Sequence, residues 1–188
     1  MKNRNEFLKE AIDRHLVKKQ LIKNDENKKL ENSFLIKSRK NFAVANILFK
    51  ISDLENIKKL LSIASDFEMY DWVIIVSYYA MYSSALAALA KLGFKSKSHA
   101  ATIAVLEYNY VKENNKNEDK IKALEQDDIH KLARAYVLSE QFITKLIQTK
   151  TKRETAQYDA TPSITRENAK KALDDAEEFI SKIEEILI

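Results

Sequence analysis

The chain of 188 residues contains no cysteine, one glycine and one proline. The lack of cysteine excludes a disulfide framework, a thiolate metal site and a cysteine nucleophile. The first residues, Met1-Lys2-Asn3-Arg4, lead into charged sequence with no apolar segment, which argues against a secretory signal. We therefore expect a protein of the reducing cytoplasm.

The scarcity of glycine and proline also bears on the fold. An average chain of this length carries about 13 glycines and about 9 prolines, and strands joined by tight turns depend on such residues. The composition therefore predicts an all-α fold without strands, an up-and-down bundle of four to five long helices. We expect residues 1–27 to form a basic N-terminal helical extension and residues 28–188 to form the bundle.

Apolar residues at spacings of three and four predict where the helices lie. One stripe indicates a helix over about 28–51, and a second, from Ala169 to Ile183, indicates a last helix that Thr165 can cap. The pattern further predicts a helix over about 4–22 and, over about 54–64, a short helix or a continuation of the preceding one. It also predicts a helix that Ser96 or Ser98 caps and that runs to Tyr110, and one through 121–146 that ends near Thr149.

Residues 72–90 run without a charge and then reach Gly93, which we expect to end this helix as a C-cap. The run is long enough to cross a bilayer, which needs about 20 apolar residues. Its many serine and tyrosine hydroxyls instead favour a helix buried in a bundle, so we expect no membrane partner. Ser65 and Glu68 fit a capping box at which this helix would begin.

The net charge of +4 is unevenly distributed. Residues 1–30 carry nine basic and five acidic side chains, whereas residues 167–188 carry three basic and seven acidic ones. A basic N-terminal part is compatible with binding a phosphate backbone. Lysine-rich helix surfaces are also commonly just solvated, so charge alone leaves both interpretations open.

The sequence does not support a metal or another cofactor. A di-iron site in a helical bundle needs two Glu-x-x-His pairs and two further glutamates. With three histidines in the chain, only Asp127 and His130 resemble such a pair, and we interpret them as a surface pair. The sequence has no glycine-rich phosphate loop and no zinc-binding spacing.

Residues 150–159 gather several groups of catalytic and binding interest. The segment holds the cations Lys150, Lys152 and Arg153, the carboxylate of Glu154 and the phenol of Tyr158. Arg153 and Tyr158 are five residues apart, so on one continuous helix they would point about 140° apart. We expect them to converge only if the segment bends or a second copy of the chain contributes. The alternative is an exposed helix end whose cations face the helix dipole.

The order and spacing of short motifs over roughly residues 28–188 resemble the HEPN superfamily. More narrowly, they resemble a small prokaryotic and archaeal branch with the motif Arg-x-x-Ala-Asp-Tyr. The motifs are Tyr70-Asp71-Trp72, Ser77-Tyr78-Tyr79-Ala80-Met81-Tyr82, Leu92-Gly93-Phe94, Ser98-His99, Arg153-x-x-Ala156-x-Tyr158-Asp159 and Glu178-Phe179-Ile180.

This resemblance implies a helical bundle that pairs as a two-fold homodimer, with both arginine motifs in one cleft. Active HEPN ribonucleases cleave RNA without a metal, using the RNA 2′-hydroxyl as nucleophile. Many members are toxins encoded beside a nucleotidyltransferase antitoxin, so the resemblance implies such a partner, together with RNA or a nucleotide as ligand.

The resemblance also implies roles for individual residues. Arg153, Glu154 and Tyr158 take the positions of the catalytic motif, and Lys150, Lys152 and Arg153 would contact nucleic acid. The implied supporting residues are His99, which matches a histidine common to the branch, Tyr82 and Asp159.

The motif departs from the family at two positions. Tyr158 replaces the expected histidine and Gln157 replaces the branch's aspartate. A tyrosine of ordinary pKa, about 10, is a poor general base near neutral pH. Two rivals therefore remain beside an RNA- or nucleotide-binding protein with endoribonuclease activity: a non-catalytic interaction partner or scaffold, and a plain helical structural protein.

Overall fold

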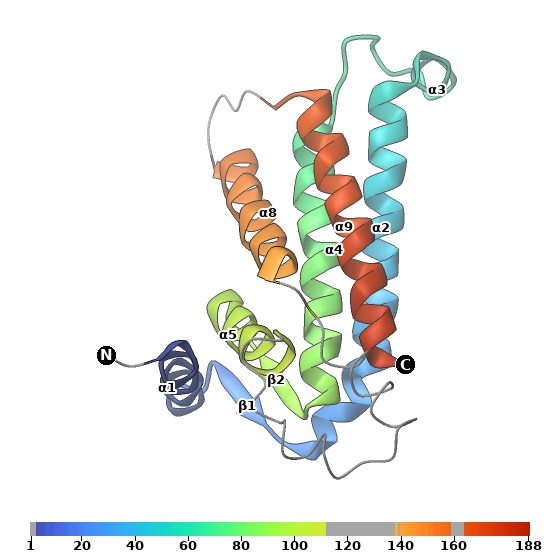
Figure 1. Cartoon of the computed structure of the whole chain (residues 1–188). Coiled ribbons are helices and arrows are strands. Elements are labelled where there is room, and N and C mark those ends of the chain that lie inside the picture. The colour runs from blue at the N-terminus through green and yellow to red at the C-terminus, as the bar shows by residue number, and fades with distance from the viewer. Residues whose placement is uncertain (1–2, 112–137, 139, 159–163) are drawn as a thin grey trace, which may run out of the picture. The chain divides into compact units, whose positions relative to one another are not determined.

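The computed structural model describes residues 3–111, 138, 140–158 and 164–188 (Figure 1). Helix accounts for 81% of the described residues, which confirms the predicted all-α class. The elements in chain order are α1 (Arg4–Val17), β1 (Leu21–Lys23), the 3-10 helix η1 (Asp25–Leu30), α2 (Glu31–Asp53), α3 (Glu55–Leu60), α4 (Tyr70–Lys91), β2 (Phe94–Ser96), α5 (His99–Tyr110), α8 (Glu140–Tyr158) and α9 (Arg166–Leu187).

The prediction that strands are absent is wrong. β1 and β2 pair antiparallel, with Leu21 opposite Ser96. Each strand follows a helix, and a residue with positive φ lies between the two. This residue is Lys19 (54°) after α1 and Gly93 (80°) after α4. Because both chain segments leave their helices extended, they pair over three residues, and this pairing also shortens the first helix, which was expected to reach residue 22.

The predicted helix caps at Gly93, Ser98 and Thr165 are confirmed. Gly93 ends α4 with its N–H donating to the carbonyl of Ala90 (2.8 Å), and a Cβ there would lie 3.3 Å from a backbone oxygen. Ser98 caps α5. Thr165 and Asn168 exchange two hydrogen bonds between side chain and backbone at the start of α9 (3.2 and 3.3 Å).

The predicted capping box of Ser65 and Glu68 is wrong, because α4 begins at Tyr70. The hydroxyl of Ser52, near the end of α2, accepts a hydrogen bond from the backbone N–H of Met69 (2.8 Å). A tertiary contact with α2, rather than a local cap, therefore meets the backbone donor that precedes this helix.

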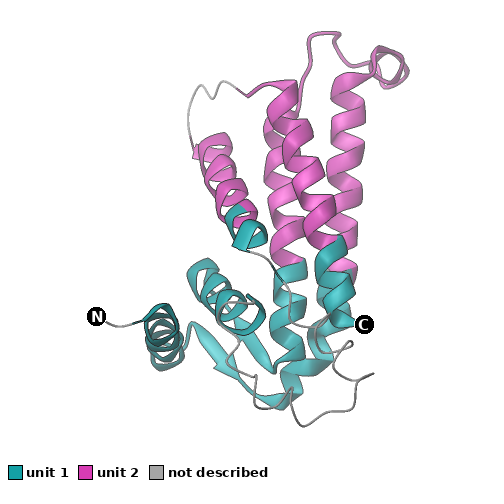
Figure 2. Cartoon of the chain, viewed as in Figure 1, with its two compact units in different colours: residues 1–35, 84–144, 181–188 teal, residues 36–83, 145–180 magenta. Residues whose placement is uncertain are grey.

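The described chain divides into two compact units, which we treat separately (Figure 2). Unit 1 comprises residues 1–35, 84–144 and 181–188, and unit 2 comprises residues 36–83 and 145–180. The predicted division of the chain after residue 27 is a different one and stays a prediction.

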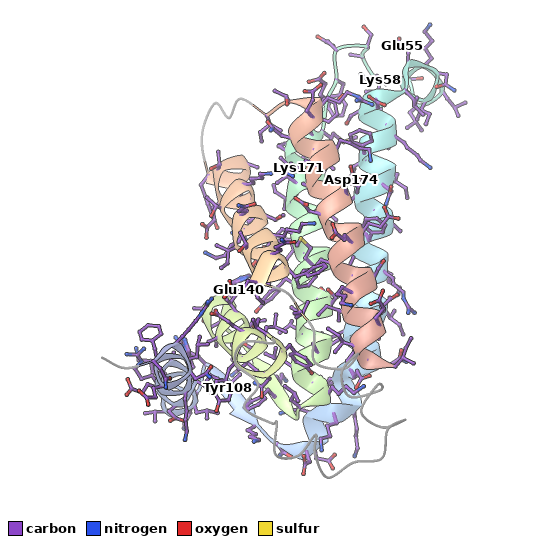
Figure 3. All side chains as sticks on the ribbon, in the orientation of Figure 1. Glu55, Lys58, Tyr108, Glu140, Lys171 and Asp174 are labelled. Atoms are coloured by element: carbon purple, nitrogen blue, oxygen red, sulfur yellow. The ribbon has the colours of Figure 1, made fainter. Side chains whose placement is uncertain are left out.

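In unit 1 the N-terminal helix is held by an arginine. Arg4 on α1 donates to Glu107 of α5 (2.7 Å) and forms an ion pair with Glu140, which is labelled in Figure 3. Tyr110 anchors α5 to α4 through a hydrogen bond to the carbonyl of Ala88 (2.8 Å). These contacts tie residues from distant parts of the sequence into one unit.

In unit 2, α2, α4 and α9 share an apolar core. Its buried members are Ala45, Phe49, Tyr70, Val73, Ala169 and Leu173. The hydroxyl of Ser38 donates to the carbonyl of Ala80 (2.8 Å), and Phe49 contacts Tyr70. A residue early in α2 thus contacts a residue farther along α4, and a residue late in α2 contacts the start of α4. The two helices therefore run antiparallel, as in an up-and-down bundle.

Among the described helices, α4 is long and apolar enough to cross a membrane. In its most apolar window, 78% of the residues are buried within the protein. A core helix passes the same test of length and composition, so this property alone is weak evidence for a membrane span.

Candidate functional site: an arginine among tyrosines

Arg153 occupies a core-facing position near the end of α8. Leu146, Thr149 and Ala156 are buried on this helix, at 1%, 1% and 8% exposure. Arg153 follows Leu146 by seven residues, so it shares their face. The pattern that buries an apolar or small side chain on successive turns thus has a guanidinium at one position, where it contacts α4 and is half-buried.

Three tyrosine rings surround the guanidinium. Its Cζ lies 5.3 Å from the ring centroid of Tyr79, 5.7 Å from that of Tyr158 and 6.0 Å from that of Tyr78. The first and last of these come from α4, whereas Tyr158 is the last residue of α8. Each ring face attracts a cation, an interaction worth about 0.5–1 kcal/mol at exposed sites and more where water is excluded.

The tyrosines of α4 support one another. Tyr78 is 1% exposed, and its ring stacks on that of Tyr82 one turn later, with centroids 6.0 Å apart at 18°. The ring of Tyr79 also lies beside that of Tyr78, with centroids 5.6 Å apart and an angle of 57° between the ring planes. Burial raises the pKa of Tyr78 well above its ordinary value, so this phenol stays neutral and serves as a packing surface.

The guanidinium is only partly satisfied by hydrogen bonds. Nη2 of Arg153 donates to the hydroxyl of Tyr79 (2.5 Å). Nε is buried and has no hydrogen-bond partner within the part of the chain that the structure describes. Desolvation lowers the pKa of Arg153, but the Tyr79 hydroxyl and then Tyr158 outweigh it and raise the pKa overall, so the cation persists.

Tyr158 corrects the expected divergence from Arg153. α8 is helical through Tyr158, yet the guanidinium lies 5.7 Å from the centre of this ring. The angle between two residues around a helix axis gives the directions of their Cα–Cβ bonds but does not fix how close the ends of two long side chains can come. The guanidinium and the ring nevertheless approach each other within one continuous helix, so no bend and no second copy of the chain is needed to bring the two together.

The remaining predicted cations divide into a paired and an unpaired one. Lys150 forms an ion pair with Glu154 one turn later (2.8 Å). Lys152 makes no ion pair with any residue that the structure describes. It lines a cleft of about 180 Å³, whose walls are Ile74, Thr151, Lys152, Thr155, Ile164 and Asn168.

The predicted supporting residues have different outcomes. Tyr82 belongs to the tyrosine cluster through Tyr78. His99 is the first residue of α5 and belongs to unit 1, and its supporting role stays a prediction. Asp159, together with Asp127 and His130, lies outside the described residues.

Tyr78 and Tyr79 lie within the family motif of residues 77–82 but are not among the predicted site residues, although both contact Arg153. A signal was present, since Tyr78 and Tyr82 at i and i+4 must share a helix face. What the sequence lacked was the pairing of α4 with α8, which decides which face meets the arginine.

Comparisons with known proteins identify the family of the chain. The family model described as HEPN domain matches residues 51–186, which include all of α4 and α8. A search of curated proteins gave no match.

Proposed function

Because the chain belongs to the HEPN domain family, we propose that it binds phosphate groups of RNA or of a nucleotide through Arg153. The observation that carries this proposal is a half-buried guanidinium held by tyrosine rings, with no carboxylate partner among the described residues. A permanent positive charge without a neutralising partner is costly to bury. A bound phosphate would supply the missing negative charge.

The hydrogen-bonding capacity of Arg153 also supports a phosphate ligand. A guanidinium carries five N–H donors in a planar fork that matches two phosphate oxygens. One donor is engaged by Tyr79, which fixes the plane of the group. The exposed Tyr158, at 70%, offers a hydroxyl and a ring face beside the same cation.

Lys152, the residue of α8 directly before Arg153, would extend the positive surface. The charge of Lys150 is largely offset by Glu154. Phosphate binding by such cations releases counterions, so the affinity should fall steeply as salt is raised.

The direct test is binding of a labelled single-stranded RNA at low salt to wild type, Arg153→Lys and Arg153→Ala. Lysine keeps the charge and loses the fork, so we expect the order wild type, lysine, alanine. Lys171→Ala is a matched control for charge, because Lys171 on α9 (labelled in Figure 3) is 64% exposed. Equal binding by wild type and Arg153→Ala would overturn the proposal.

We further propose metal-independent cleavage of the bound RNA. The 2′-hydroxyl oxygen would attack the adjacent phosphorus and lose its proton, the bond from phosphorus to the 5′-oxygen would break, and the leaving oxygen would take up a proton. The products are a 2′,3′-cyclic phosphate and a 5′-hydroxyl. Arg153 would stabilise the charge on the phosphoryl oxygens, and the Tyr158 hydroxyl would donate to the phosphate.

Incubation of RNA with the protein in a metal chelator tests this step. We expect Arg153→Ala to abolish cleavage and Tyr158→Phe to reduce it, because phenylalanine keeps the ring and deletes the hydroxyl. Tyr158→His should raise the rate, since histidine suits proton transfer near neutral pH. Intact RNA in every reaction would reject cleavage while leaving the binding proposal to its own test.

A second candidate function is non-catalytic docking of another protein, such as a nucleotidyltransferase or a second copy of the chain. The observation in its favour is an exposed apolar face on α2, with Ile36, Val44 and Ile47 at 43%, 45% and 55%. Light scattering measures the mass directly, and Ile47→Glu should dissociate a homodimer that uses this face. A monomer at micromolar concentration would reject the homodimer, and failure to co-purify with a co-expressed nucleotidyltransferase would reject that partner.

A further inference from the structure

Trp72 is an exposed aromatic residue that the arginine site does not use. It is the only tryptophan of the chain, and 55% of it is exposed. Its ring lies at the start of a core helix and would gain free energy by burial, for example against a bound flat group.

Trp72 lies on the same face of α4 as Tyr79. The two are seven residues apart, which is close to two helical turns, with a rise of about 10.5 Å between them. Val76, at the intermediate turn, is partly buried against the core of unit 2. Tyr79 in turn contacts Arg153. One helix face thus carries an exposed ring at one end and the ring that orients the guanidinium at the other.

The charges near the two ends differ in sign. Arg153 is positive beside Tyr79, whereas Asp71 precedes Trp72 directly and Glu68 lies just before the helix. A phosphate is therefore favoured at the Arg153 end and disfavoured at the Trp72 end. A flat uncharged group is favoured at Trp72, because stacking on an aromatic ring requires no charge.

We propose that Trp72 is a stacking platform for a base of single-stranded RNA whose phosphate is bound by Arg153. This inference rests on the proposed phosphate binding and adds the position and chemistry of a second contact. The ligand is then an oligonucleotide with a base within reach of Trp72, rather than a free phosphate. Stacking is tolerant of base identity, so the contact selects single strands over duplexes rather than one sequence.

The single tryptophan makes the contact directly measurable. The full-length chain is titrated with a short single-stranded oligoadenylate, and with an abasic ribose-phosphate strand of the same length and charge, while Trp72 emission and its quenching by acrylamide are recorded. We expect the oligoadenylate to quench the emission and to protect Trp72 from acrylamide. The abasic strand should bind through Arg153 and leave both signals unchanged.

Affinity measurements on variants separate stacking from the phosphate contact. Replacing Trp72 by Ala should weaken oligoadenylate binding about 5- to 100-fold, the range for removing one stacking partner, and leave binding of the abasic strand unchanged. Trp72→Phe keeps a ring and should lose less. Phe67→Ala is a matched control, because Phe67 is also an exposed aromatic residue (44%) but lies outside α4.

Three results would overturn the inference in distinguishable ways. If oligoadenylate binds with dependence on Arg153 but leaves Trp72 emission and quenching unchanged, the platform is wrong and the phosphate site stands. If neither strand binds, the proposed function fails and the platform fails with it. If Trp72 emission shifts on dilution without RNA, the ring is covered by a second copy of the chain instead.

Discussion

Unit 2 contains two arginines that lie over aromatic rings and have opposite electrostatic surroundings. Arg166 at the start of α9 lies 5.3 Å from the ring centroid of Phe49, the same separation as Arg153 from Tyr79. Arg166 also donates two hydrogen bonds to the carboxylate of Asp53 at the end of α2, one from Nε and one from Nη2 (2.9 Å). Arg153 has a phenol where Arg166 has a carboxylate.

This difference separates an arginine that is paired within the fold from one whose surroundings fit the proposed anionic ligand. The forked pair of Arg166 and Asp53 is electrically neutral and joins the ends of two helices. The tyrosines contact Arg153 on several sides, and no carboxylate among the described residues compensates its charge. A site that binds an anion needs the second arrangement, because a resident carboxylate would compete with the ligand.

The largest expected difference between the two arginines is in RNA binding. Arg153→Ala should weaken binding of single-stranded RNA about 10- to 100-fold, the range for losing hydrogen bonds from a charged group. Arg166→Ala should leave the affinity unchanged, because its charge is already neutralised. Fluorescence anisotropy at low salt measures the RNA affinity of both variants. Equal losses of affinity would show that the different surroundings of the two arginines do not matter for RNA binding.

Stability should rank the same two residues in the reverse order. Arg153→Met keeps an aliphatic stem among the tyrosines and removes the buried Nε–H, which has no hydrogen-bond partner among the described residues. The free energy of unfolding should therefore stay within about 1 kcal/mol of wild type. Arg166→Met leaves Asp53 without its partner and should lower the urea midpoint further. A greater loss for Arg153→Met would mean that the tyrosine cluster is a structural clamp.

The hydroxyl of Tyr79 should have a smaller effect than the guanidinium it orients. Tyr79→Phe retains the ring and removes the acceptor for Nη2, so RNA binding should weaken about 2- to 10-fold, as for one ordinary hydrogen bond. Tyr82→Phe is the matched control, because Tyr82 contacts Tyr78 rather than the guanidinium in the ring geometry. Equal affinities for all three proteins would remove Tyr79 from the site.

The smallest effect is expected from pH. The hydrogen bond from Arg166 holds the pKa of Asp53 below its ordinary value of about 3.8. The pair therefore stabilises the fold fully above pH 4 to 5, and this contribution is lost as the pH falls through the lowered pKa. Urea unfolding at pH 6 and pH 3 should show that the gap between wild type and Asp53→Asn narrows in acid.

RNA binding through Arg153 should be independent of this titration, because the pKa of Arg153 is raised from an already high value. Affinities that are equal from pH 5 to pH 8 would agree with the comparison. A decline over that range would assign binding to a group that titrates there, such as a histidine.

Much of the fold was predictable from local sequence. The apolar stripes placed the long helices, except that α8 continues to Tyr158 instead of ending near Thr149. Gly93, Ser98 and Thr165 marked helix ends because each supplies a local conformation or hydrogen bond that its own neighbours need. The failures were non-local. The start of α4 depends on Ser52, which is 17 residues before Met69, and the strands pair across more than 70 residues.

The site follows the same division. The sequence by itself determined that Arg153 and Tyr158 lie within one short segment, and the family motif gave that segment its interest. Only the three-dimensional structure decided that Tyr78 and Tyr79 of α4 contact the guanidinium, and that the guanidinium also lies close to the ring of Tyr158. Helix periodicity defines the face on which a residue lies, whereas packing between helices and the choice of side-chain rotamer determine what it contacts.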